Sequence, residues 1–169
     1  VYNLAFASER LFSAILWDSF FGVIKEPLKL DKEALMRSCM GKLSEAQERI
    51  SYVRLFFPNS LDLTEETLNS AYDDFSKGDY AFCLIKASKA KADADMIINS
   101  FSIDLEKINQ TIDRRAELVR MIISHQTSKG LFPVLGYSYF EYAQSLKTHK
   151  PFSSLLYLEY SLELSNLDI

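Results

Sequence analysis

The feature that most constrains this chain of 169 residues is an unbroken alternation of three- and four-residue steps between apolar side chains. The stripe comprises Met36, Cys39, Leu43, Ala46, Ile50, Val53 and Phe57. A repeat of 3.5 residues keeps one face of a helix turned toward a neighbour over several turns. The spacing therefore predicts a long helix, capped by Asp31 and ended by Pro58, that packs along a long antiparallel mate.

Apolar residues at helical spacing predict six further helices. We expect them from Leu4 to about Phe21, from Thr64 to Gly78, after an Asp79 cap, after a Ser102 cap, from Pro133 and from Pro151. The helix after Asp79 carries closely spaced alanines, which let a neighbouring backbone approach. Whether the fourth and fifth helices are separate or form one bent helix stays open. The predicted fold class is all-α, with about seven helices in antiparallel hairpins that are tetratricopeptide-like or bundle-like.

Composition supports this fold class and excludes some classes of function. Five glycines and four prolines are too few to form the turns of a many-stranded β protein. A net charge of −4 argues against a general attraction to nucleic acid or to anionic lipid. No apolar run approaches the length that spans a bilayer, so we expect no membrane insertion by this chain. We expect one helical domain over residues 1–169, excised from a longer chain, with a possible subdomain break near residues 126–132.

The residues that usually carry chemistry are sparse. Cys39 and Cys83 lie in apolar helical contexts and are predicted to be small core residues, while a disulfide between them stays open. His125 and His149 lie near predicted helix ends without the spacing of a helical metal site. The series from Asp104 to Glu117 has mixed signs, typical of a solvated helix face. The sequence has no phosphate-binding loop and no nucleophile elbow, so we predict no catalytic, cofactor-binding or metal-binding residues.

Aromatic residues are more informative, because the chain has twelve Phe, nine Tyr and one Trp. The last two predicted helices carry aromatic side chains around more than one face, and a single buried stripe does not accommodate all of them. Either these helices are central or part of their aromatic surface meets a partner. The candidate partner contacts are Tyr137, Tyr139, Tyr142, Tyr157 and Tyr160.

Two resemblances follow from short strings. The string AYDDFSKGDYAFCLIKASKA, residues 71–90, resembles a tetratricopeptide hairpin. The strings SEAQERISYVRLFFP, GDY, YFEYAQSL and LYLEYSLELSNLDI are together similar to the helical region that follows the protease domain of archaeal Lon-like serine protease homologues. That resemblance implies a parent chain with an upstream Ser-Lys dyad protease domain, and it allows a membrane-spanning segment near one end of the parent. No catalytic position of that family maps onto this chain.

These observations predict a non-catalytic helical domain for protein interaction or scaffolding, accessory to a Lon-like protease domain if the resemblance holds. The expected partner is protein: a second copy, a domain of the parent chain, or a substrate. The alternatives are a small-molecule-binding helical bundle and an enzyme with an unrecognised site. The sequence gives no indication of localisation.

Overall fold

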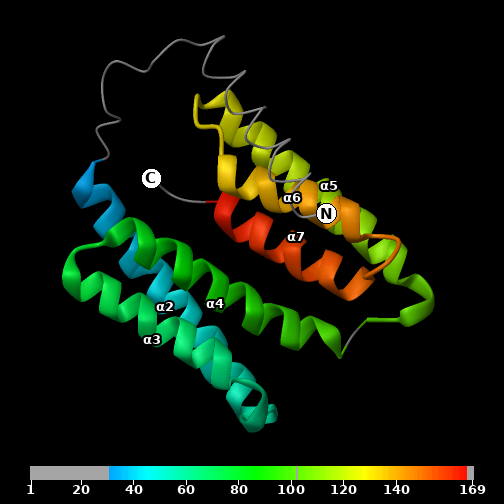
Figure 1. Ribbon diagram of the computed structural model, residues 1–169, viewed down its shortest axis with the longest axis horizontal. Coiled ribbons are helices and arrows are strands. Elements are labelled where there is room, and N and C mark those ends of the chain that lie inside the picture. The colour runs from blue at the N-terminus through cyan, green and yellow to red at the C-terminus, as the bar shows by residue number, and fades with distance from the viewer. Residues whose placement is uncertain (1–30, 102, 167–169) are drawn as a thin grey trace, which may run out of the picture. The chain divides into compact units, whose positions relative to one another are not determined.

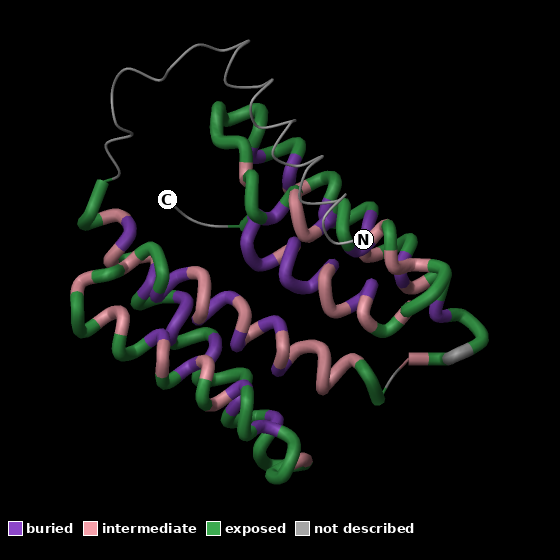
Figure 2. Tube along the Cα trace, in the orientation of Figure 1, coloured by how far each residue is buried: buried purple, intermediate pink, exposed green. Residues whose placement is uncertain are grey.

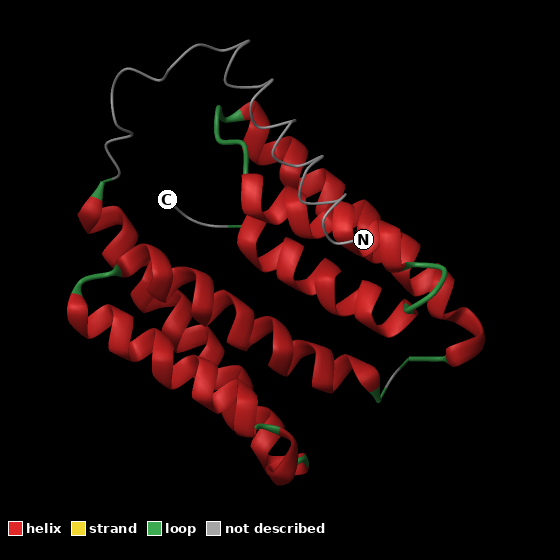
Figure 3. Ribbon diagram, in the orientation of Figure 1, coloured by secondary structure: helices red, strands yellow, loops and turns green. Residues whose placement is uncertain are grey.

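The computed structural model describes residues 31–101 and 103–166, in which helices joined by short loops are present and strands are absent (Figures 1 and 3). The α-helices in this part of the chain are α2 (Lys32–Phe56), α3 (Asp62–Lys77), α4 (Tyr80–Ser100), α5 (Ile108–Ser128), α6 (Val134–Leu146) and α7 (Pro151–Ser165). The predicted all-α class is confirmed. The helix predicted from Leu4 to about Phe21 lies outside the described residues.

Several predicted helix ends are confirmed. The Asp31 carboxylate accepts hydrogen bonds from the backbone N–H groups of Glu33 at 2.9 Å and Ala34 at 3.2 Å, which caps α2. Gly78 ends α3 with φ of 79°, in the left-handed region that favours glycine. Pro151 is the first residue of α7, where its missing N–H costs no helical hydrogen bond.

Other predicted boundaries were confirmed only in part, and one that the sequence left open is resolved. The helix expected from Thr64 begins two residues earlier, at Asp62, and Thr64 is buried within its first turn. Asp79 precedes α4, but its side chain makes no capping hydrogen bond. The fourth and fifth helices are separate: α4 ends at Ser100 and α5 begins at Ile108, after a short 3₁₀ turn over Leu105–Lys107.

The predicted apolar stripe forms the core face of α2, but the direction of its long mate was wrong. Five members of the stripe are buried: Cys39, Leu43, Ala46, Ile50 and Val53. The side chains that pair α2 with α4 advance together along both helices, from Cys39 with Cys83 to Arg49 with Asp95. The two helices therefore run parallel (Figure 1), and the shorter α3 supplies the antiparallel packing.

A disulfide between Cys39 and Cys83 ties α2 to α4. The two Cα atoms are 6.0 Å apart, within the range that a disulfide requires, and both residues are fully buried. The prediction that both cysteines belong to the core is confirmed, and the structure pairs them with each other.

The buried apolar residues form two separate clusters. The first fills the space between α2, α3 and α4, and the second fills the space between α5, α6 and α7. The two helical groups meet where α4 packs antiparallel to α7. Figure 2 shows that α7 is buried along most of its length, and its buried residues face several directions. This helix is the central element of the described region.

Small residues let α6 and α7 approach closely. The Ser161 hydroxyl donates to the backbone carbonyl of Gly136 at 2.6 Å, and the Ser154 hydroxyl donates to that of Ala143 at 2.8 Å. A Cβ atom on Gly136 would lie closer than van der Waals contact to the Ser165 side chain and to the backbone atoms of Ser161 and Ser165 in α7. Glycine is therefore required at this crossing because α7 occupies the space of a side chain.

Candidate functional site

Four of the five predicted contact tyrosines form one cluster across α6 and α7. The ring of Tyr157 stacks on Tyr139 at 5.7 Å between centroids and meets the edge of Tyr142 at 4.6 Å. Tyr160 lies 5.5 Å from Tyr139 and 5.7 Å from Tyr157. Such separations and tilted planes are those of aromatic rings in direct contact. We call these four residues the tyrosine cluster.

The fifth candidate, Tyr137, belongs to a different group of rings. Its ring lies 5.4 Å from Phe132 and 6.4 Å from Phe140, near the start of α6. A hydrogen bond with Glu141 raises the pKa of the Tyr137 hydroxyl, since the nearby carboxylate disfavours a second negative charge. The sequence therefore placed five tyrosines together, whereas the fold separates one of them from the other four.

Exposure divides the tyrosine cluster into a base and a surface. Tyr160 is buried, Tyr139 and Tyr157 are half-buried, and Tyr142 keeps 42% of its surface exposed. The rings occupy the space between one another, so the cluster cannot enclose a ligand. Any partner must meet its outer surface, through ring faces and hydroxyl groups.

The base of the cluster is anchored to α4. The Tyr160 hydroxyl donates to the Asp93 carboxylate at 2.5 Å, and the Lys89 ammonium lies 5.3 Å from the centre of the Tyr160 ring. Burial, together with this hydrogen bond to a carboxylate, raises the pKa of Tyr160 far above its usual range. Burial also raises the pKa of Asp93. The tyrosine cluster is thus connected to both helical groups.

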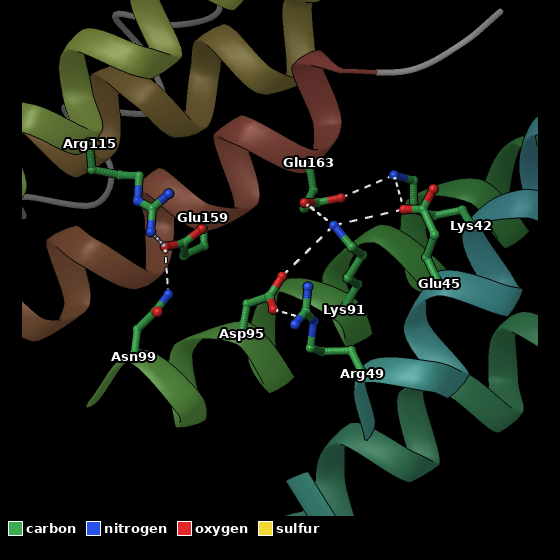
Figure 4. Close-up of polar contacts among 9 residues, drawn as sticks. All are labelled: Lys42, Glu45, Arg49, Lys91, Asp95, Asn99, Arg115, Glu159 and Glu163. Carbon is green, nitrogen blue, oxygen red and sulfur yellow. Dashed lines mark hydrogen bonds and ion pairs between the residues drawn. The ribbon is translucent and has the colours of Figure 1, made fainter. Parts of the chain in front are cut away.

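A second site, a buried charge network, follows the same contact between α4 and α7 (Figure 4). The Glu163 carboxylate bridges two ammonium groups, Lys42 at 3.1 Å and Lys91 at 2.5 Å. Burial alone would lower the pKa of Lys42, but Glu163 and Glu45 outweigh it and raise that pKa. Lys42 is therefore held in its charged form by carboxylates.

The network continues toward solvent through a polar cleft. Lys42 also pairs with Glu45 at 2.8 Å, and the Arg49 guanidinium pairs with Asp95 at 2.7 Å. The cleft, of about 360 Å³, is lined by Glu45, Glu48, Arg49, Tyr52 and Lys91. Because three of its four charged side chains, Glu45, Arg49 and Lys91, already form ion pairs, the cleft offers no strong field of one sign to a ligand.

Glu159 belongs to a second group of charged and polar side chains, which no hydrogen bond or ion pair among the described residues joins to the ion pairs of Glu163. Its carboxylate pairs with Arg115 at 2.8 Å and accepts a hydrogen bond from Asn99 at 3.3 Å, so it joins α4, α5 and α7 (Figure 4). Burial raises the pKa of Glu159 to about 7, although Arg115 opposes this rise. A small cavity of about 100 Å³ lies beside this group and is lined partly by Met96, Thr111 and Leu155.

We expect Glu159→Gln to stabilise the protein by about 3 kcal/mol at pH 8 and to have almost no effect at pH 4. The folded-state pKa of about 7 exceeds the ordinary 4.5, so the native state binds the proton more tightly than the unfolded chain. The resulting stability is complete below pH 4.5 and is lost as the pH rises through 7. Chemical denaturation of both proteins from pH 4 to pH 8 measures the difference.

The matched control for this prediction is Glu117→Gln on the exposed face of α5, where the side chain is 64% exposed. It should change stability by less than about 0.5 kcal/mol at every pH. A Glu159→Gln variant whose stability relative to the wild type is the same at pH 8 as at pH 4 would contradict the assignment.

Sequence reasoning missed the charge network, and one of its interpretations was partly wrong. Arg115 was included in a solvated face, whereas it is half-buried and pairs with Glu159. A signal was present in α7, where Glu159 and Glu163 stand four residues apart in an otherwise apolar and serine-rich helix. That spacing places two acids on one face of a buried helix, and buried acids require cationic partners.

The described residues contain no group of three His, Cys, Asp or Glu side chains arranged to hold a metal ion. Within the same part of the chain, every helix is too short or too polar to cross a lipid bilayer. Comparison of the whole chain with family models, with curated proteins and with solved structures gives no match in any of the three.

Proposed function

We propose that this chain is a non-catalytic helical domain that binds protein through the outer surface of the tyrosine cluster. The observation that carries the proposal is the graded exposure of four touching rings, from the buried Tyr160 to the exposed Tyr142. Tyrosine is favoured in protein interfaces because it offers a large apolar area and a hydroxyl group with few rotatable bonds.

The anchoring of the cluster supports the same proposal. Tyr160 is fixed by Asp93 below it, and Tyr157 is held between Tyr139 and Tyr142. Because these rings are already ordered in the free chain, binding a partner costs little of their side-chain entropy, which favours affinity. The expected partner is a second copy of the chain, a domain of a longer parent chain, or a protein substrate.

We expect Tyr142→Ala to weaken partner binding about tenfold or more, because truncating a central interface tyrosine commonly costs more than 1 kcal/mol. Tyr72→Ala on α3 is the matched control, since Tyr72 is 41% exposed and lies outside the cluster. The measurement is crosslinking followed by quantitative mass spectrometry of wild type and both variants at equal concentration. Both variants should keep the thermal stability of the wild type.

Loss of the same partners from the Tyr142→Ala and Tyr72→Ala variants would count against the cluster as the binding surface. Full retention of every partner by a combined Tyr139→Ala and Tyr142→Ala variant, with its fold intact, would refute it. Tyr160→Ala is unsuitable for this test because Tyr160 is buried and bonded to Asp93, so its loss would change stability as well.

The Lon-like resemblance adds a narrower proposal, in which the domain positions substrate for a protease domain of the same chain or holds its oligomer together. Proteolysis by a parent chain that carries Tyr142→Ala, compared with the unaltered parent, would test it. We expect slower cleavage of folded substrates and unchanged cleavage of a short peptide. An unaltered parent without proteolytic activity would remove this proposal and leave the interaction role untouched.

A further inference from the structure

The chain contains one complete acceptor motif for N-linked glycosylation. Residues 109–111 read Asn-Gln-Thr, in which a hydroxyl residue stands two positions after an asparagine and the residue between them is not proline. Of the six asparagines in the chain, Asn109 alone meets this condition. Asn59, Asn69 and Asn99 are each followed by a serine, but each has an apolar residue at the second position.

Asn109 lies on the surface near the start of α5. It is the second residue of that helix and follows the 3₁₀ turn over Leu105–Lys107, in the segment that connects α4 to α5. Asn109 is exposed, and the exposed residues on either side of it include Glu106, Gln110 and Asp113, which are all polar. A hydrophilic sugar can therefore extend from this position into water without displacing an apolar contact.

Thr111, the hydroxyl residue of the motif, is engaged once α5 has formed. In the folded chain Thr111 is half-buried, and its hydroxyl donates to the Lys107 carbonyl at 3.3 Å, one helical turn earlier. A transferase that recognises this hydroxyl needs the motif in an extended segment. Sugar transfer at this motif must therefore precede the folding of α5.

The disulfide between Cys39 and Cys83 supports the compartment that this modification requires. Both residues are fully buried between α2 and α4, so the bridge forms before or during the packing of these helices. Structural disulfides form and persist mainly outside the reducing cytoplasm, in the compartments where N-glycosylation also takes place. The exposed motif on α5 and the buried disulfide on two other helices therefore agree on one folding environment.

We propose that Asn109 is the acceptor of an N-linked oligosaccharide. The donor is a lipid-linked oligosaccharide, whose first sugar is joined through its C1 atom to a phosphate oxygen of the lipid carrier. The amide nitrogen of Asn109 forms a bond with C1 and loses one proton to a general base of the transferase. The bond from C1 to the phosphate oxygen breaks, and its electron pair stays on the phosphate.

The test uses the whole chain, produced in its own organism, with intact-mass and glycopeptide mass spectrometry. The wild-type mass should exceed the mass of the sequence by a whole number of sugar residues, all attached to Asn109. Asn109→Gln and Thr111→Ala should lose the entire excess, whereas Thr111→Ser should keep sugar because serine also supplies a hydroxyl. Asn69→Gln is the matched control, since Asn69 is exposed on α3 but has Ala71 at the second position, and it should keep the full excess.

Three outcomes would overturn the proposal. The first is a wild-type chain whose mass equals that of its sequence. Cys39 and Cys83 that resist alkylation in that same sample would place the chain in an oxidising environment and still refute Asn109 as an acceptor. The second is sugar that remains in Asn109→Gln or is found on Asn69. The third is an equal sugar content in Thr111→Ala and the wild type, because the motif would then not be what the transferase recognises.

Discussion

Replacing Glu163 with Gln is expected to lower the free energy of unfolding by about 3 to 5 kcal/mol. The side chain is 9% exposed and bridges two ammonium groups, Lys42 and Lys91. A neutral amide of the same shape keeps the packing but removes the buried carboxylate from both cations. Lys42 then keeps only the half-exposed Glu45, and Lys91 keeps Glu45 and Asp95 at 3.7 and 3.8 Å. The penalty comes from charges that stay buried without their main partner, and urea denaturation at pH 7 measures it directly.

The control for Glu163 is Glu45→Gln, which removes a carboxylate that contacts the same Lys42. Because the Glu45 side chain is 50% exposed, water replaces most of the lost interaction, and we expect a cost below about 1 kcal/mol. Equal costs for the two variants would show that burial does not govern the network. A double variant, Glu163→Gln with Lys42→Met, should recover part of the loss by removing one unpaired charge.

Gly136→Ala is expected to destabilise the protein by about 3 kcal/mol, although alanine is the better helix former. The added Cβ would meet the Ser165 side chain and would lie 3.0 Å from the backbone nitrogen of Ser165 and 3.1 Å from the backbone oxygen of Ser161. A side chain can rotate away, but the two backbone atoms cannot move without displacing α7. Thermal and urea denaturation should both report the loss.

Gly41→Ala is the opposite case on α2, since nothing lies within 4 Å of its added Cβ. This substitution should stabilise the protein by about 0.5 to 1 kcal/mol, because alanine loses less backbone entropy in a helix. Removing the serine hydroxyl in a Gly136→Ala and Ser165→Ala variant should restore only part of the loss, given the backbone contacts. Complete recovery would mean that the hydroxyl alone determines the need for glycine.

The sequence was sufficient to predict the helices because each helix depends on local apolar spacing. The stripe from Cys39 to Val53 was predicted and is buried, and the αL residue at Gly78 was predicted as well. The direction of the neighbour was not predictable, because the same stripe fits a parallel or an antiparallel mate. Only the pairing of Cys39 with Cys83 and of Arg49 with Asp95 fixes the direction.

The tyrosine cluster and the charge network differ in how much of each could be predicted from the sequence. Four tyrosines on neighbouring helices were predictable as a candidate surface. Two short helices carry more aromatic side chains than one buried face can hold, so the others must pack against each other or against a partner. The pairing of Lys42 with Glu163 joins residues 121 positions apart, and no local pattern specifies it. The sequence of a helix does not show which of its charged side chains are buried, because that depends on how the helices pack.

The disulfide between Cys39 and Cys83 spans 44 positions and encloses the whole of α3 in a covalent ring. A protease that cuts the backbone once inside this ring would open it without releasing either fragment, because the sulfur bridge still holds the two pieces together. The group formed by α2, α3 and α4 can therefore stay together after a single backbone cleavage within the ring. The ring also limits how far α2 and α4 can separate when α3 unfolds locally.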